Sequence, residues 1–148
     1  MPRVAALIVK DDAVALIERR LLEGLYDLLP GGAVEPGEWL PAALARELQE
    51  ELGCSIAVGR LVAEVTYKGA IQYYFAADIV GGEFGTGRGV ELAADSSSES
   101  GSYTPVWIPI SDLLRTPVYP KGVAKIVVSA WNRGWPTKTI VFSDPGRP

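Results

Sequence analysis

Three glutamates, Glu47, Glu50 and Glu51, lie within one short segment of the chain, directly after Arg46. They are separated by three and four residues, so a helix through them would bring their carboxylates onto one face. Like charges at i, i+4 cost an isolated helix about 0.2–0.5 kcal/mol, and a bound divalent cation would reverse that repulsion. Oxygen donors of this kind suit Mg²⁺ or Mn²⁺, and such a cation can activate water and neutralise phosphate.

The chain contains no histidine. This excludes Ser-His-Asp triads, histidine general bases and histidine-ligated metal sites. Any catalysis must therefore run on carboxylates. A glutamate-rich amphipathic surface helix without any chemistry would show the same local pattern, so the helix alone leaves both interpretations open.

Composition limits the remaining possibilities. The 148 residues suffice for one domain with its own core, which we place at 1–148. Cys54 is the only cysteine, so no intrachain disulfide forms and a cytoplasmic location is expected. A net charge of −4 argues against a nucleic-acid partner, and no apolar run is long enough for a membrane span. A small phosphorylated ligand stays compatible with this charge.

One helix must position the three glutamates. Leucines recur every fourth residue from Leu40 to Leu52, which predicts a helix over 40–52 with an apolar stripe about 100° from the carboxylates. Pro41 suits its first turn, and Gly53 suits a left-handed residue just after its end. A turn-rich loop over 31–38 precedes it. Strands are predicted at 4–9, 13–18, 26–29, 56–67, 71–80, 106–110 and 139–142, with a second helix at 122–131 and a long loop at 81–102. The fold class is α/β.

The spacing of the loop and helix residues is more specific than the helix alone. The fixed positions are Gly32, Glu38, Arg46, Glu47, Glu50, Glu51 and Gly53. Segment 32–54 thereby resembles the Nudix box, G-x5-E-x7-R-E-U-x-E-E-x-G-U, with Cys54 in the last apolar position. Such a match arises by chance on the order of once in a billion windows. Leu29-Pro30-Gly31-Gly32 and Trp107-Ile108-Pro109 extend the resemblance.

This resemblance implies the Nudix fold, a mixed β-sheet sandwiched between α-helices. It also implies hydrolysis of a diphosphate linkage in a nucleoside diphosphate derivative, with Mg²⁺ or Mn²⁺ as cofactor. Glu47, Glu50 and Glu51 would be metal ligands, and Glu47 is alternatively the general base. Arg46 and Glu38 would orient these carboxylates.

Three further residues are expected at the substrate. Arg20 ends the second strand, where Nudix proteins often carry a phosphate-contacting arginine; the alternative is a solvated strand end. Trp39 stands where many Nudix proteins carry a helix-capping Ser or Thr. It either lies near the substrate cleft or packs against other side chains. Gly32 lets the loop take a shape that a side chain would obstruct. Tyr67, Tyr73 and Tyr74 either line a base or sugar pocket or pack in the core.

The loop 81–102 carries the carboxylates Glu91, Asp95 and Glu99. In some Nudix enzymes the general base lies outside the box, and Glu91 is the first candidate here. A solvated loop whose acids have no role is the alternative.

The predicted function is a pyrophosphohydrolase of a small nucleotide, acting as a monomer or homodimer. The motif Leu-Pro-Gly-Gly differs from the form frequent in ADP-ribose hydrolases, which favours a (d)NTP or modified dNTP. A Nudix domain that binds a nucleotide as a sensor without turnover is the alternative function.

Overall fold

A computed structural model describes residues 1–87 and 101–146 of the chain. Within these ranges the first half contains β1 (Arg3–Leu7), β2 (Val9–Lys10), β3 (Ala13–Leu21), β4 (Gly24–Leu28), β5 (Gly31–Ala33), α1 (Leu40–Leu52), β6 (Cys54–Tyr67) and β7 (Ala70–Gly82). The second half contains β8 (Ser102–Pro109), the 3-10 helix η1 (Ile110–Arg115), β9 (Val118–Tyr119), α3 (Lys121–Ala130) and β10 (Ile140–Asp144).

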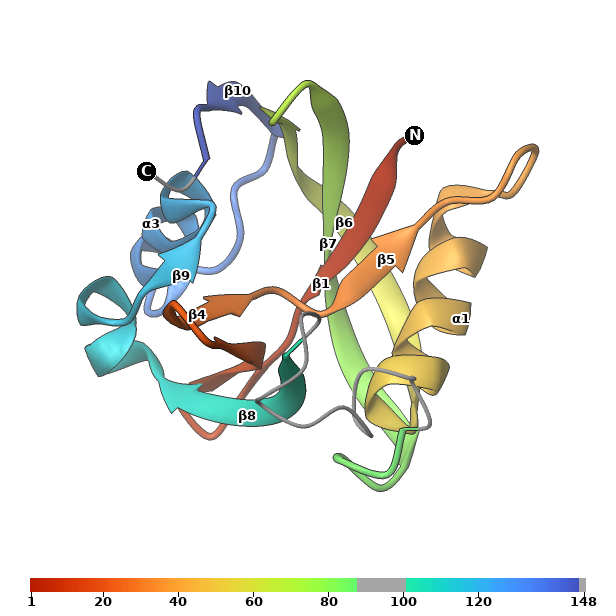
Figure 1. The fold of residues 1–148 in the computed structure, drawn as a ribbon. Helices are drawn as coiled ribbons and strands as arrows, with labels where there is room; N and C mark the ends of the chain where they lie inside the picture. Colours follow the sequence, from red (N-terminus) through yellow and green to blue (C-terminus); the bar gives the residue numbers. More distant parts are fainter. Residues whose placement is uncertain (88–100, 147–148) are drawn as a thin grey trace.

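The strands form two mixed sheets (Figure 1). The first has the order β10-β6-β7-β1-β5, with β1 parallel to β7 and β10 parallel to β6. The second has the order β2-β3-β4-β9, and β8 pairs antiparallel with the other edge of β3. The described strands and helices confirm the α/β class, and the strands divide between two sheets.

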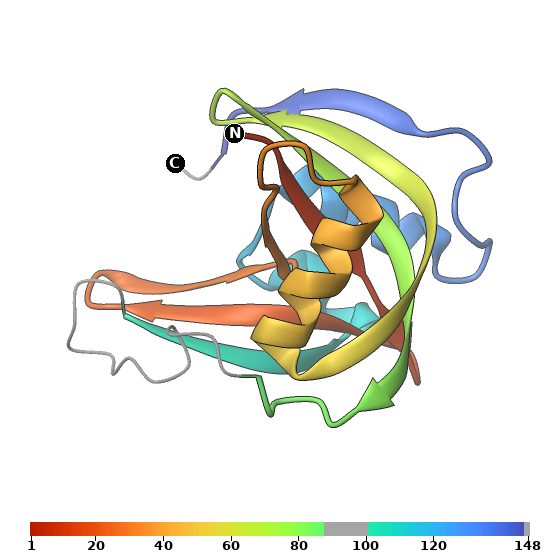
Figure 2. The same cartoon turned by 90° about the vertical axis from the view of Figure 1, so that its right-hand side faces the viewer.

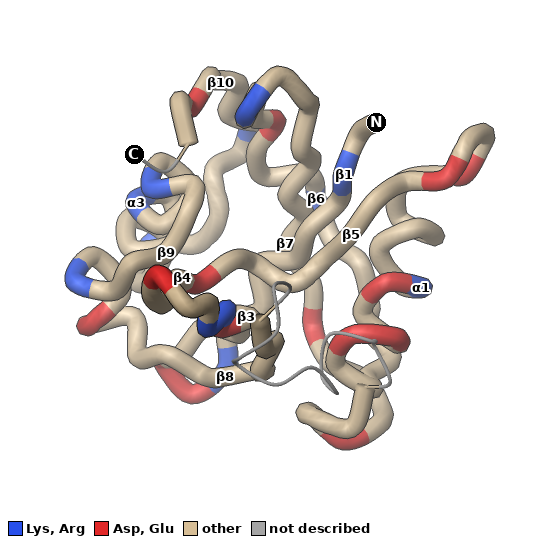
Figure 3. Tube along the Cα trace, in the orientation of Figure 1, with Lys and Arg blue, Asp and Glu red and all other residues tan. Residues whose placement is uncertain are grey.

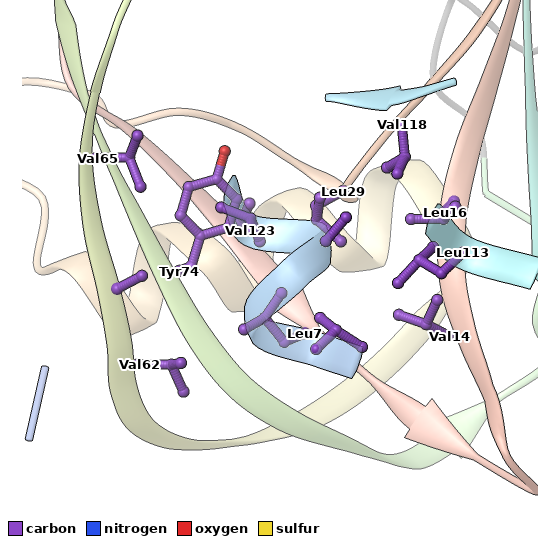
Figure 4. Packing of buried hydrophobic residues seen from close by; sticks show 14 of the residues in the cluster. Leu7, Val14, Leu16, Leu29, Val62, Val65, Tyr74, Leu113, Val118 and Val123 are labelled. Carbon is purple, nitrogen blue, oxygen red and sulfur yellow. The ribbon is translucent and has the colours of Figure 1, made fainter. Parts of the chain in front are cut away.

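The two helices cover separate parts of the core. Figure 2 shows α1 lying against strands of both sheets. Its apolar face packs in a cluster that includes Val4, Ile17, Leu44 and Phe75. On the other side, α3 inserts Val123 among residues of both sheets and η1, beside Tyr74 (Figure 4). Each of the two buried clusters contains residues of both sheets, so the two clusters together hold the sheets against each other.

Most predicted elements are present; the predicted strand 4–9 is divided into β1 and β2, and the short strands β5 and β9 are additional. β5 occupies the start of the predicted 31–38 loop and pairs with β1, so that Gly31 lies opposite Ala5. A Cβ at Gly31 would lie 1.9 Å from the carbonyl oxygen of Val4, so glycine permits this close pairing. β9 pairs with β4 over residues far apart in the sequence, a contact that no local pattern predicts. No described helix has the length and apolar character needed to cross a membrane.

Candidate active site

The helix α1 forms with the predicted boundaries because its leucine stripe is fully buried. Leu44, Leu48 and Leu52 have no exposed surface. The main-chain N–H of Gly53, in the left-handed conformation, closes the end of the helix by donating to the carbonyl oxygen of Gln49. Acidic residues recur along α1 and in the loop between β5 and α1 (Figure 3). Burial of the stripe thus fixes the rotation of α1 about its axis, and with it the side from which the three carboxylates project.

Arg46, in the middle of α1, binds acidic residues of both the helix and the loop before it. Its guanidinium donates two hydrogen bonds to Glu38, with nitrogen–oxygen distances of 2.8 and 2.9 Å, and one to Glu47 at 2.9 Å. A further bond reaches the carbonyl oxygen of Ala33 at 3.1 Å, and Glu50 lies 3.7 Å away. Arg46 therefore ties the loop to the helix with a rigid fork.

These bonds set the charge of the pair. Hydrogen bonds from Arg46, and then from the main-chain N–H of Glu35, lower the pKa of Glu38 to about 2. The carboxylate of Glu38 in turn raises the pKa of Arg46 above its already high value. The pair stays fully ionised across the neutral range.

Two glycines bring the loop against the helix carboxylates. The main-chain N–H of Gly31 donates to Oε1 of Glu51 at 2.8 Å. A Cβ at Gly32 would lie 2.2 Å from the carboxylate of Glu47. The side chain of Glu47 is 18% exposed and that of Glu50 is 57% exposed, so these two carboxylates differ in access to solvent.

A cavity of about 330 Å³ opens beside this helix face, within the size range of small-molecule sites. Glu51 and Gly31 form part of its wall. Its cations are Arg3, Arg19 and Lys68, and its aromatic residues are Tyr26, Tyr67, Tyr74, Tyr103 and Tyr119. The lining residues include these three cations and one carboxylate, Glu51, so the cavity has an excess of positive charge. This charge and the tyrosines suit an anionic ligand with an aromatic or sugar part.

Arg19 lines the cavity, whereas its neighbour Arg20 does not. The guanidinium of Arg19 lies 3.8 Å from the ring centroid of Tyr103 and donates a 3.2 Å hydrogen bond to the hydroxyl of Tyr26. Arg20 is 58% exposed and 3.8 Å from Glu18. The expectation of a phosphate contact by Arg20 stays a prediction, and Arg19 is a candidate that the sequence reasoning missed.

The other substrate candidates are placed as follows. Trp39 is 74% exposed and makes no side-chain cap of α1. Tyr67 and Tyr74 line the cavity, whereas Tyr73 packs against the α1 cluster. Tyr26, Tyr103 and Tyr119 also line the cavity, although sequence reasoning did not select them. The loop candidates Glu91, Asp95 and Glu99 lie outside the described residues.

No group of three or more acids, histidines or cysteines close enough to hold a metal ion is found within residues 1–87 and 101–146. Glu47 is bound by Arg46, and Glu51 by Gly31. Mg²⁺ is usually held by one or two carboxylates completed by water and substrate phosphates. The all-oxygen donors Glu50 and Glu51 fit that incomplete kind of site.

The family model described as NUDIX domain matches residues 1–126. The chain is 31% identical over 117 residues to an 8-oxo-(d)GTP phosphatase of Mycolicibacterium smegmatis, covering 76% of this chain and 32% of that protein. It is 44% identical over 63 residues to the CTP pyrophosphohydrolase of Escherichia coli, covering 40% of this chain and 46% of that protein. The matched parts amount to less than half of either relative's length.

A solved structure shares the fold across nearly the whole chain. The ADP-ribose pyrophosphatase of Streptococcus suis superposes with a TM-score of 0.64 at 18% identity. The match covers 97% of this chain and 98% of that one. At this identity the likeness establishes the fold alone.

Proposed function

Because this chain belongs to the Nudix hydrolase family, we propose that it is a divalent-metal-dependent pyrophosphohydrolase that cleaves the diphosphate linkage of a nucleoside diphosphate derivative. The position of Glu51 carries this proposal. Its carboxylate accepts the N–H of Gly31, and the residue forms part of the wall of the 330 Å³ cavity. A helix carboxylate of the Nudix box thus borders a space that fits a nucleotide.

Glu50 and Glu51 are the proposed metal ligands. Glu47, the third ligand that the family resemblance implies, is assigned below to proton transfer instead. Nudix hydrolases generally use divalent metal ions. When bound, Mg²⁺ or Mn²⁺ supplies Lewis acidity toward diphosphate oxygens and lowers the pKa of a coordinated water. Oxygen donors favour these hard cations over Zn²⁺.

The reaction requires a water oxygen to bond to one phosphorus while the bridging phosphorus–oxygen bond breaks. The proton of that water passes to a carboxylate, and the leaving phosphate departs with the electron pair. We assign the proton to Glu47, which Arg46 holds at 2.9 Å, with Glu91 as the alternative base. Arg46 and Glu38 act as positioning residues, since their paired hydrogen bonds fix the direction of the Glu47 carboxylate.

A nucleoside triphosphate is the proposed substrate. The cations Arg3, Arg19 and Lys68 of the cavity wall suit a polyphosphate, and its tyrosines suit a base and sugar. Two relatives support the same class, since their names specify an 8-oxo-(d)GTP phosphatase and a CTP pyrophosphohydrolase.

A panel assay tests the proposal. Purified protein is incubated with Mg²⁺ or Mn²⁺ and with canonical and 8-oxidised (d)NTPs, ADP-ribose and a nucleoside diphosphate sugar, and the products are separated by chromatography. We expect nucleoside monophosphate and pyrophosphate from at least one triphosphate, at higher kcat/KM than for the other classes. Nucleotide binding without turnover under any condition would instead support the sensor function.

A further inference from the structure

A short segment after β7, residues 83–87, packs against the C-terminal end of α1; we call it the brace. The main-chain N–H groups of Gly85 and Thr86 both donate to the carbonyl oxygen of Leu52, at 3.0 and 3.2 Å. The last carbonyls of a helix lack partners within the helix itself. The brace therefore completes the end of α1 that carries Glu50 and Glu51.

At Gly87 the brace lies so close to the helix backbone that there is no room for a side chain. A Cβ at this position would lie 2.3 Å from the carbonyl oxygen of Glu51 and 2.5 Å from that of Glu50. The backbone of Gly87 lies outside the left-handed region, so the requirement for glycine is steric. An added methyl group would have to move backbone atoms by about 1 Å to reach ordinary contact at 3.4 Å.

The brace is itself held in place. The ring of Phe84 stacks on Trp107 of β8 with centroids 4.7 Å apart, and the hydroxyl of Thr86 donates to the carbonyl oxygen of Glu83 at 2.7 Å. On the helix side, Gly53 has no room for a Cβ, which would lie 2.2 Å from the Thr86 hydroxyl oxygen. Because Phe84 packs on Trp107, a displacement of the helix end toward the brace would also have to disturb β8.

We propose that Gly87 is a positioning residue for the metal-dependent reaction, because its contact with the carbonyls of Glu50 and Glu51 fixes where these two carboxylates project. The inference rests on the proposed function, in which Glu50 and Glu51 hold the cation. Displacements of about 1 Å can cost 10²-fold in rate, and loss of outer-shell support typically weakens metal binding by 10- to 100-fold.

The test measures Mn²⁺ affinity by calorimetry, and kcat at saturating Mn²⁺, for Gly87→Ala in the full chain. We expect affinity to fall about 10- to 100-fold and kcat to fall with it. Gly81→Ala is the tolerated control, since its Cβ would find ordinary contact at 3.6 Å with Ser55. Gly101→Ala is the control for a disruptive change away from α1: its Cβ would lie 2.3 Å from the Arg20 carbonyl oxygen, and its φ of +68° adds backbone strain. Both controls should keep Mn²⁺ affinity within about twofold of the wild type.

Glu51→Gln in the same titration separates the two proposals. If it loses Mn²⁺ affinity while folded Gly87→Ala keeps it, the inference about the brace is wrong and the proposed function stands. If Glu51→Gln also keeps wild-type affinity, both are wrong. If Gly87→Ala does not fold, Thr86→Ala decides, because it removes the hydroxyl that bonds to Glu83 and lies beside Gly53, and adds no atom near α1. We expect a loss of about three- to fivefold there, and wild-type affinity would overturn the inference.

Discussion

The main-chain N–H of Gly31 donates a 2.8 Å hydrogen bond to Oε1 of Glu51, joining the strand before the box loop to the last turn of α1. Gly31 directly precedes the box and Glu51 lies near its end. The bond therefore brings these two parts of the chain together at the cavity wall, to which both residues contribute. The loop and the helix are thus joined by a direct hydrogen bond between a glycine main-chain group and a glutamate carboxylate.

Gly32→Ala tests the neighbouring contact. The new Cβ would lie 2.2 Å from the Glu47 carboxylate, which is the end of a flexible side chain and would move away from Arg46. We expect kcat to fall about tenfold or more, because a charged hydrogen bond contributes about 1.5–3 kcal/mol, with a change in Tm of only a few degrees. Steady-state kinetics and thermal melts measure both. An unchanged kcat would show that the exact position of Glu47 does not matter.

The ion pair of Glu38 and Arg46 predicts acid sensitivity. The pKa of Glu38 is lowered from 4.5 to about 2 in the folded state, so the pair's stabilisation is complete above pH 4.5 and is lost as the pH falls toward 2. The Tm difference between wild type and Glu38→Gln should therefore shrink over this interval. Thermal melts from pH 2 to 7 measure it, and a pH-independent difference would contradict the assignment.

The effect of Asp27 on stability should change with pH in the opposite direction. Burial, and then repulsion from Glu18, raise its pKa from 3.8 to about 6, so the folded state retains a proton that the unfolded state has released. Stability is therefore lost as the pH rises from 3.8 to 6. Asp27→Asn should be about 1–3 kcal/mol more stable than wild type at pH 7.5 and similar at pH 3.5. Urea unfolding at both pH values checks this, and lower stability of Asp27→Asn at pH 7.5 would refute it.

Arg19 and Arg20 form a matched pair for substrate binding. Arg19 lines the cavity beside Tyr103, whereas Arg20 is mostly exposed. We expect Arg19→Ala to lower kcat/KM for a triphosphate by about tenfold or more, since charge-assisted bonds contribute about 1.5–3 kcal/mol, and Arg20→Ala to lower it less. Arg19→Lys should restore only part of the loss, because the guanidinium fork is missing. A larger effect for Arg20 would assign the phosphate contact to that residue.

The sequence predicted α1 to its exact ends, Leu40–Leu52, because a regular leucine stripe, an early proline and a terminal glycine all act locally. It could not choose between Arg19 and Arg20. Both faces of β3 are buried over Val14–Ile17, so alternation gives no sign of which face meets a cavity. That choice depends on the pairing of Arg19 with Tyr26 on one side and Tyr103 on the other.

The remaining cavity residues depend on contacts between distant segments. Tyr103 reaches the cavity through the register of β3 and β8, and Tyr119 through the short parallel pairing of β4 and β9. β9 has only two residues, too few for a periodic pattern. The burial of Asp27 could not be predicted either, because the sequence of β4, Gly-Leu-Tyr-Asp-Leu, has no alternation of apolar and polar residues that would mark position 27 as buried.

The most direct test of the central claim follows triphosphate hydrolysis as Mg²⁺ is titrated, for the wild type and for Glu51→Gln. Glutamine keeps an oxygen that can accept the Gly31 N–H but lacks the charge of a metal ligand. We predict turnover at millimolar Mg²⁺ or at lower Mn²⁺, none in excess EDTA, and a loss of roughly 10³-fold in folded Glu51→Gln. Full activity in excess EDTA, or a wild-type rate in Glu51→Gln, would contradict the account.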